Sequence, residues 1–365
     1  MSRLPRRALP GSVVFALALL LAATTALAAP KDHLVRFSTT IAPPSPASVD
    51  ISWVENSSGR YFLADRSNKA IDLFDARTDT FTGFIGQGQF TGNGACNGDP
   101  FAGAGPDGVV TDSSGLVWAG DGNSTIKVLN PVAGTNVVTS IGTGGKCRAD
   151  ELSFDPRDQL ILIANDAEGF LTFIDVSTRS VAGHFYYADN TLGQPESVAG
   201  HATAGGGLEQ SVWDAQTGLF YQAVPAGGTT GFIDVFDPVS ERLVASYPVP
   251  GCDGGPTGLA LGENERFLGA CGNGAVAVEL RSGRIHAFIP EVGGADEIWF
   301  NPGDDNFYLA IFAGARLGVV NADNDKLVQI LSGRGSHSVA AYAGNNHIFD
   351  PGFGTGIAVF VSGGH

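Results

Sequence analysis

The chain has 365 residues, 43% of them apolar and only 16% charged, and its formal net charge at pH 7 is −16. It contains 51 glycines and 19 prolines, and the glycine content is about twice the usual share of ~7%. This composition favours many turns and excludes a helical bundle. The apolar fraction is too high for a disordered chain. The acidic balance disfavours nucleic acid and anionic membrane surfaces as partners.

The N-terminus carries the pattern of a secretory signal peptide. Three arginines within the first seven residues precede an apolar run from Val13 to Ala23, which is shorter than the ~20 residues that span a bilayer. Ala26 to Ala28 supplies the small residues that signal peptidase requires. We expect residues 1–28 to be removed, which takes the net charge from −16 to −19. Residues 29–365 are then expected to form one periplasmic or secreted domain without a membrane span.

One short pattern recurs along the rest of the chain: apolar, any residue, two apolar residues, then Asp or Asn and a turn. Such a pattern is typical of a strand that ends at a turn. Full copies are Ile71–Asp75, Ile126–Asn130, Leu171–Asp175, Ile233–Asp237 and Leu317–Asn321, with weaker copies at 276–279 and 357–360. Two further short strands are expected before each copy. The anchor residues of the first of these strands mark seven repeats: Trp53, Val109, Leu152, Ser211, Leu259, Ile298 and Val339.

These repeats predict an all-β, seven-bladed β-propeller of four-stranded blades. The most closely spaced anchors are 39 to 43 residues apart, which is close to the length of one blade. A lone sheet of this size cannot bury both of its apolar faces, whereas seven sheets around an axis cover one another and leave only short edges. The last repeat ends at Val361 without an outer strand, so we expect Leu34 to Ile41 to supply it and close the ring.

The four cysteines predict two disulfides in an oxidising compartment. None lies in a C-x-x-C or C-x-x-C-H motif, so we expect no haem, and the absence of P-loop and dinucleotide motifs predicts no nucleotide cofactor. Three cysteines lie in connections between blades and one ends a second strand. These positions favour Cys96–Cys147 and Cys252–Cys271 among three possible connectivities. A reactive thiol is the alternative interpretation.

The candidate site is formed by residues that open the innermost strands, since these strands begin at one mouth of the axial channel, beside the loops that join the blades. Two positions before the seven anchors stand Ile51, Asp107, Asp150, Glu209, Thr257, Asp296 and His337, and two further glutamates, Glu151 and Glu297, each follow one of them. Like charges in one place raise each other's pKa unless a cation lies between them. The pattern therefore suggests a cation site, and the alternative is that these aspartates cap loops.

The chemistry of this set depends on its donor atoms. Carboxylate oxygens of Asp107, Asp150, Glu209 and Asp296 suit Ca²⁺ or Mg²⁺, and a histidine ligand would also admit Zn²⁺. In an enzyme, the cation would polarise a substrate carbonyl while His337 moves a proton. Glu209 and His337 are therefore the candidate catalytic residues.

Two segments resemble a known propeller family. Leu162–Asp175 resembles a blade of the YVTN-repeat propellers, and Pro256–Leu261 resembles the opening of such a blade. The resemblance implies a propeller over most of the mature chain and an exported protein, in a family where many members have no assigned activity. Glu209–Trp213 is also similar to the opening of gluconolactonase-like (regucalcin-like) propellers, and this resemblance implies that Glu209 binds a divalent metal.

Two functions remain open from the sequence. The first is an exported propeller that binds a small-molecule ligand or a periplasmic protein on its loop-rich channel face. The long connections 86–106 and 188–207, the latter with His201, would rise over the channel mouth and form its walls. The second is a divalent-metal-dependent hydrolase or lyase, similar to a lactonase, that acts at the channel mouth.

Overall fold

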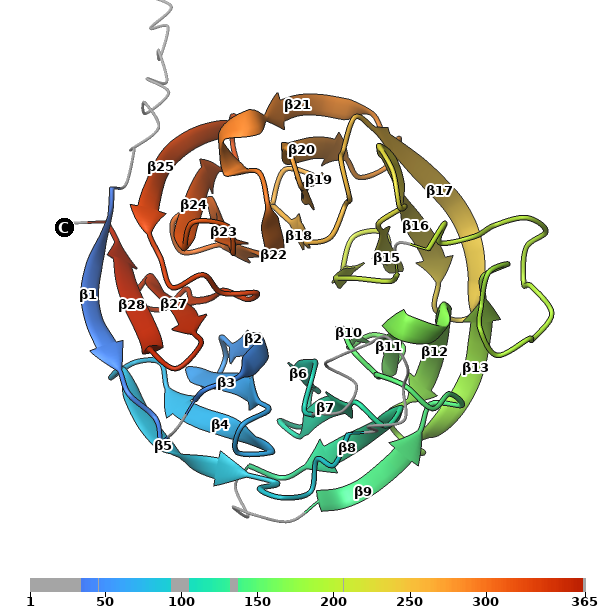
Figure 1. The fold of residues 1–365 in the computed structure, drawn as a ribbon, viewed down its shortest axis with the longest axis horizontal. Helices are drawn as coiled ribbons and strands as arrows, with labels where there is room; N and C mark the ends of the chain where they lie inside the picture. The colour runs from blue at the N-terminus through green and yellow to red at the C-terminus, as the bar shows by residue number, and fades with distance from the viewer. Residues whose placement is uncertain (1–33, 45, 93–104, 132–136, 206, 364–365) are drawn as a thin grey trace, which may run out of the picture. The chain divides into compact units, whose positions relative to one another are not determined.

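The structure is a computed structural model that describes residues 34–44, 46–92, 105–131, 137–205 and 207–363. These residues form seven four-stranded antiparallel sheets arranged as blades around an axis (Figure 1). The helices within the described ranges are two short 3-10 turns, Asp166–Glu168 and Pro290–Val292. The prediction of an all-β, seven-bladed propeller is therefore confirmed.

In each blade the strands follow one another from the axis outward. Blades one to three contain β2 (Val49–Glu55), β3 (Arg60–Asp65), β4 (Ala70–Asp75), β5 (Thr80–Ile85), β6 (Val109–Thr111), β7 (Val117–Asp121), β8 (Thr125–Leu129), β9 (Val137–Gly142), β10 (Leu152–Asp155), β11 (Leu160–Asn165), β12 (Phe170–Asp175) and β13 (Ser180–Tyr186). Blades four to six contain β14 (Ser211–Asp214), β15 (Leu219–Val224), β16 (Thr230–Asp237), β17 (Arg242–Pro250), β18 (Leu259–Leu261), β19 (Arg266–Cys271), β20 (Gly274–Glu279), β21 (Ile285–Ile289), β22 (Ala295–Asn301), β23 (Asn306–Ile311), β24 (Arg316–Asn321) and β25 (Lys326–Ser332). Blade seven contains β26 (Ala340–Tyr342), β27 (His347–Gly352), β28 (Gly356–Ser362) and β1 (Val35–Ile41).

The outermost strand of blade seven comes from the beginning of the described chain. Strand β1 pairs antiparallel with β28, from Val35 opposite Ser362 to Ile41 opposite Ile357, with one irregularity after Phe37. Val35 and Ile41 are buried, while the residues between them are exposed. This pairing gives blade seven its fourth strand.

The recurring aspartate of the sequence pattern has a local structural role. Asp75 and Asp175 each end the third strand of a blade, and their Oδ1 atoms accept backbone hydrogen bonds from Arg77 at 2.9 Å and from Thr178 at 2.7 Å. These bonds stabilise the turn into the fourth strand, as short polar side chains commonly do. The pattern is therefore a strand-and-turn signal, and it carries no information about ligands.

The core lies between the faces of neighbouring blades. One apolar cluster contains Trp118 of blade two together with Ile161 and Ile163 of blade three, and the next contains Leu162 of blade three and Phe220 of blade four. Alternate residues of β11 thus face opposite neighbours, which explains why this strand is buried throughout. Each blade depends on both neighbours to cover its apolar faces.

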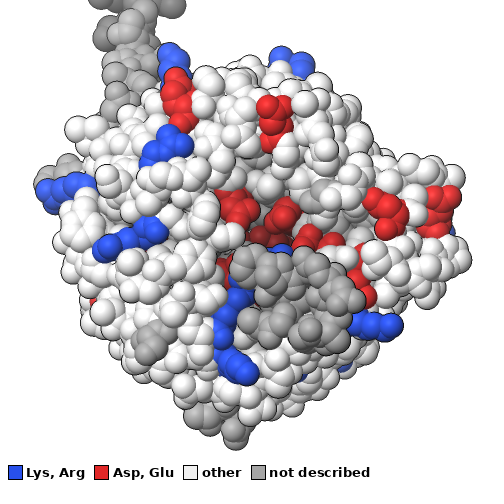
Figure 2. Space-filling view, in the orientation of Figure 1, with Lys and Arg blue, Asp and Glu red and all other residues white. Residues whose placement is uncertain are grey.

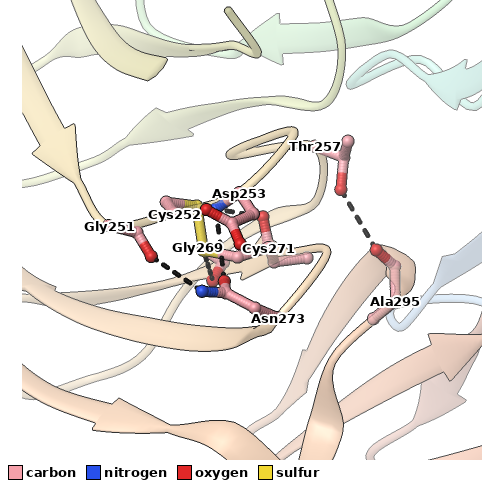
Figure 3. The surroundings of a disulfide bond; sticks show 9 residues. Gly251, Cys252, Asp253, Thr257, Gly269, Cys271, Asn273 and Ala295 are labelled. Carbon is pink, nitrogen blue, oxygen red and sulfur yellow. Dashed lines mark hydrogen bonds between the residues drawn. A yellow bond between two sulfur atoms is a disulfide. The ribbon is translucent and has the colours of Figure 1, made fainter. Parts of the chain in front are cut away.

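One disulfide fastens the entrance of blade five. Cys252 lies in the loop before this blade, and its bond to Cys271 joins that loop to the end of β19, with the two Cα atoms 5.0 Å apart (Figure 3). The Asn273 side-chain amide also donates a hydrogen bond to a backbone carbonyl of the loop at 3.0 Å. The predicted Cys252–Cys271 pair is confirmed. Cys96 lies outside the described residues, so the Cys96–Cys147 pair stays a prediction.

The export signal also stays a prediction, because residues 1–28 lie outside the described ranges. Among the described residues, no helix has the length and the apolar character needed to cross a membrane. Periplasmic or secreted localisation, and the single-domain assignment of residues 29–365, likewise remain expectations from the sequence.

Candidate functional site

The innermost strands bring charged residues from six blades to one mouth of the axial channel. Each innermost strand contacts the innermost strand of the next blade, so the residues that open these strands converge. Figure 2 shows acidic side chains gathered at the centre of this face. We use the name acidic mouth for this cluster of carboxylates with its cations: Asp50, Asp107, Asp150, Glu151, Asp166, Glu209, Asp296, Glu297, Arg66, Arg148 and His337.

Arg66 joins the carboxylates of blades one and two. It follows β3 directly, and its guanidinium forms ion pairs with Asp50 and with Asp107, whose Oδ1 lies 2.7 Å from Nη2. Its Nε also donates to Asp107 Oδ1 at 3.0 Å. All three side chains are buried, with exposed fractions of 2% or less. Buried charges of this kind need a partner because they have lost their solvation.

Arg148 makes the corresponding contacts on the next side of the mouth. Its Nη2 lies 2.9 Å from Asp150 Oδ2 and 3.8 Å from Asp50 Oδ2, and its Nη1 lies 3.0 Å from Asp166 Oδ2. Asp50 therefore lies between the two guanidinium groups. Among the described residues, this network contains four carboxylates and two guanidinium groups.

Three of these carboxylates form a compact triad. Asp50, Asp107 and Asp150 are buried and each offers one oxygen within 4.8 Å of the others. In addition, Asp107 Oδ2 and Asp150 Oδ1 are buried without a hydrogen-bond partner among the described residues. Burial raises the pKa of Asp107 and of Asp150, against the opposing effect of the arginines. The triad therefore places three carboxylate oxygens close enough together that one cation could contact all of them.

A second carboxyl pair lies beside the triad. Glu151 and Glu297 are both buried, with exposed fractions of 4% and 3%. Burial raises the pKa of each, and the negative charge of Glu297 raises that of Glu151 further. The other charges that raise their pKa values are those of Asp50 and Asp296, which are negative too. Glu297 Oε1 has no hydrogen-bond partner among the described residues.

Asp296 and His337 form a more exposed pair at the rim of the mouth. His337 Nδ1 lies 2.7 Å from Asp296 Oδ2, and the side chains are 27% and 30% exposed. Burial lowers the pKa of His337, but the hydrogen bond and charge of Asp296 outweigh this effect and raise it. The histidine ring also contacts Phe312 and Phe353 edge-on. This pair has the geometry of a proton-transferring histidine oriented by a carboxylate.

Glu209 is influenced by the charges of both the triad and the Asp296–His337 pair. Burial raises its pKa, and the negative charges of Asp166, Asp296 and Asp150 raise it further. Glu209 and Asp296 nevertheless lie outside the triad. Of the four metal ligands expected from the sequence, the structure thus brings only Asp107 and Asp150 within one coordination sphere. The ligand and catalytic roles of all four, and of His337, stay predictions.

The triad member Asp50 was not expected from the sequence, because the residue of blade one that corresponds to the anchor Ile298 is Ser52, not Trp53. The ladder between β2 and β3 shifts register between Val49 and Ser52, and the ladder between β22 and β23 shifts in the same way between Ala295 and Ile298. Trp53 therefore corresponds to Trp299, not to Ile298. Aligning the two tryptophans in the sequence would have matched Asp50 with Asp296.

The long connection after β13 does not have the expected position. His201 Nε2 bonds Asp234 Oδ2 at 2.7 Å on β16, and Tyr187 donates to the same oxygen at 2.9 Å. Ser197 and Val198 line a surface cavity together with residues of β13 and β17. The part of this segment around residues 197–201 therefore packs beside the outer strands of blades three and four and not at the channel mouth, whereas its last residue, Gly207, lies against Asp166 of the acidic mouth.

The network predicts a large stability effect for Arg66→Met. The free energy of unfolding of this variant should be about 3–5 kcal/mol lower, because it removes the cation of buried Asp107 and one of the two cations of buried Asp50. Denaturant unfolding followed by tryptophan fluorescence measures this difference. The matched control is Arg281→Met, which removes an exposed partner of Glu265 and should leave the midpoint unchanged. Equal midpoints for both variants would contradict a structural need for Arg66.

Comparison with known proteins adds information about the fold. No protein-family model and no curated protein matches the chain. Solved structures do match: hydrazine synthase of Kuenenia stuttgartiensis has a TM-score of 0.66 at 12% identity, over 87% of this chain and 95% of that chain. The mitotic checkpoint complex has a TM-score of 0.65 at 9% identity, over 99% of this chain and 100% of that chain. At such identities the likeness shows a shared propeller fold, and the YVTN-repeat and gluconolactonase resemblances stay predictions.

Proposed function

We propose that the protein is an exported ligand-binding propeller whose acidic mouth holds a divalent cation. The observation that carries this proposal is the buried triad, in which Asp107 Oδ2 and Asp150 Oδ1 have no hydrogen-bond partner within the described parts of the chain. Among the described residues, the triad and Asp166 together contain four carboxylates, against the two arginines that contact them. One divalent cation would supply the missing charge.

The donor atoms favour Ca²⁺ or Mg²⁺ over Zn²⁺. The triad offers oxygens alone, which suits hard cations, whereas zinc sites usually include nitrogen or sulfur ligands. His337 bonds Asp296 and lies outside the triad. A cation held at the channel mouth would present its open coordination positions to an anionic or carbonyl-bearing ligand, or to a partner protein, on the same face.

The pKa shifts predict how pH and the cation act together. Burial raises the pKa of Asp107 and of Asp150, so the folded protein keeps protons that the unfolded chain releases near pH ~4. In cation-free buffer the free energy of unfolding should therefore fall as pH rises from about 4 toward neutral. Because a cation replaces these protons, Ca²⁺ should stabilise the protein more at pH ~8 than at pH ~5.

Unfolding midpoints with Ca²⁺ or with a chelator test this prediction. At a Ca²⁺ concentration of about 100 Kd the gain should be about 2.7 kcal/mol. Asp107→Asn and Asp150→Asn should each remove the gain, whereas Asp323→Asn, which changes an exposed carboxylate in the turn after β24, should retain it. A protein whose midpoint ignores Ca²⁺, Mg²⁺ and Mn²⁺ at pH ~8 would contradict the cation site.

A hydrolase is the second candidate function, and the Asp296–His337 pair is the observation that favours it. The charges of Asp50 and Arg66 act on His337, so this histidine lies within electrostatic range of the triad. A triad-bound cation could polarise a lactone or ester carbonyl while neutral His337 accepts a proton from the attacking water.

A panel of lactones and esters, assayed with the cation-loaded protein, tests this second candidate. Turnover should rise with pH through the raised pKa of His337, because the imidazole must lose its proton to act as a base. His337→Gln should abolish turnover and keep the Ca²⁺-dependent stabilisation. If no compound is turned over, the hydrolase is excluded for these substrates while the binding function still stands.

A further inference from the structure

A cavity of about 420 Å³ occupies the axial channel, farther along the innermost strands than the triad. Residues from the innermost strands of blades one to six line it, and its walls are mostly apolar and aromatic. The large wall residues are Trp53, Phe154, Trp213, Leu261, Trp299 and Phe300. A volume of this size is within the usual range of small-molecule sites.

A polar layer forms the part of the lining nearest the acidic mouth. Ser211 donates to Ser153 at 2.8 Å, which joins blades four and three. Ser52, which also lines the cavity, bonds Ser338 of blade seven at 2.9 Å. The amide of Gln210 bonds backbone groups of blades five and six at 2.7–3.1 Å. These groups satisfy one another, whereas Trp213 Nε1 and Trp299 Nε1, which also line the cavity, are buried without a hydrogen-bond partner among the described residues.

Glu151 is the one charged side chain among the described residues that line the cavity. It is buried, and the nearby Glu297, whose charge acts on it, has an Oε1 without a hydrogen-bond partner among the described residues. The arginines of the mouth make their ion pairs with aspartates instead: Asp50, Asp107, Asp150 and Asp166. Among the described residues no ion pair reaches either glutamate, so an ammonium group in the cavity would give Glu151 a cationic partner.

We propose that this cavity binds an organic cation, namely an ammonium group carried on an apolar, ring-containing body. Glu151 would accept hydrogen bonds from the ammonium group, and Glu297 would share the negative charge. The ring-containing body would fill the aromatic part of the cavity, where indole and phenyl faces also attract cations. Anionic ligands are disfavoured by the carboxyl pair and by the net charge of −16.

This site is separate from the proposed cation site. The triad consists of Asp50, Asp107 and Asp150, none of which lines the cavity. Binding of an organic cation in the cavity therefore does not require Ca²⁺. The ligand titrations that test it are made in the presence of a chelator.

The test compares three probes of similar shape: 2-phenylethylammonium, 2-phenylethanol and phenylacetate. Three of the four tryptophans of the chain line the cavity, so tryptophan emission reports occupancy, and calorimetry gives the affinity. We expect saturable 1:1 binding of the ammonium compound, about tenfold tighter than that of the alcohol because of its charge. We expect no binding of phenylacetate.

Variants test whether Glu151 causes the preference for the ammonium compound over the alcohol. Glu151→Gln should bring the affinities for the ammonium compound and the alcohol together, whereas Glu196→Gln, on the exposed connection after β13, should retain the tenfold difference. If Glu151→Gln does not fold, Val212→Trp serves instead, because it fills the cavity and leaves Glu151 in place. Binding of the ammonium compound should then be lost. Equal affinities for ammonium and alcohol in the unchanged protein, or no saturable binding, would overturn the proposal.

Discussion

The structure depends on one constraint: a four-stranded sheet with two apolar faces must be covered on both sides. In this chain each blade is covered by its two neighbours around the axis. In blade three, Ile161 and Ile163 pack against blade two, while Leu162 packs against blade four. Strand β1 pairs with β28, so that blade seven also has four strands. The arrangement requires almost no helix and leaves each connection free to vary.

The same constraint concentrates charge at the axis. Innermost strands from distant parts of the sequence begin together, so one acidic residue per blade is enough to form a cluster. Such a cluster would repel itself if it were left alone. Arg66 and Arg148 offset part of that repulsion by bridging carboxylates of different blades. The charge that they leave uncompensated is the physical basis of the proposed cation site.

The sequence predicts the propeller well because its signals are local. Strand length, the aspartate that caps a turn, and the repeat spacing can all be recognised within about 40 residues. The site is harder to predict, since it depends on register and on long-range pairing. Strand pairing makes Ser52, not Trp53, the counterpart of Ile298, so the acidic position of blade one is Asp50. Nothing near Arg148 in the sequence indicates that it contacts Asp50 of blade one. The position of His201 beside Asp234 is likewise a tertiary contact.

The most direct test of the central claim is anomalous diffraction from a crystal soaked in Mn²⁺, a cation that accepts the same oxygen ligands. The account predicts one strong peak at the acidic mouth, with oxygens of Asp107 and Asp150 about 2–2.6 Å away. A crystal with no peak there, in which Arg66 and Arg148 still bridge the carboxylates, would show that the arginines alone neutralise the cluster. That result would contradict the cation site.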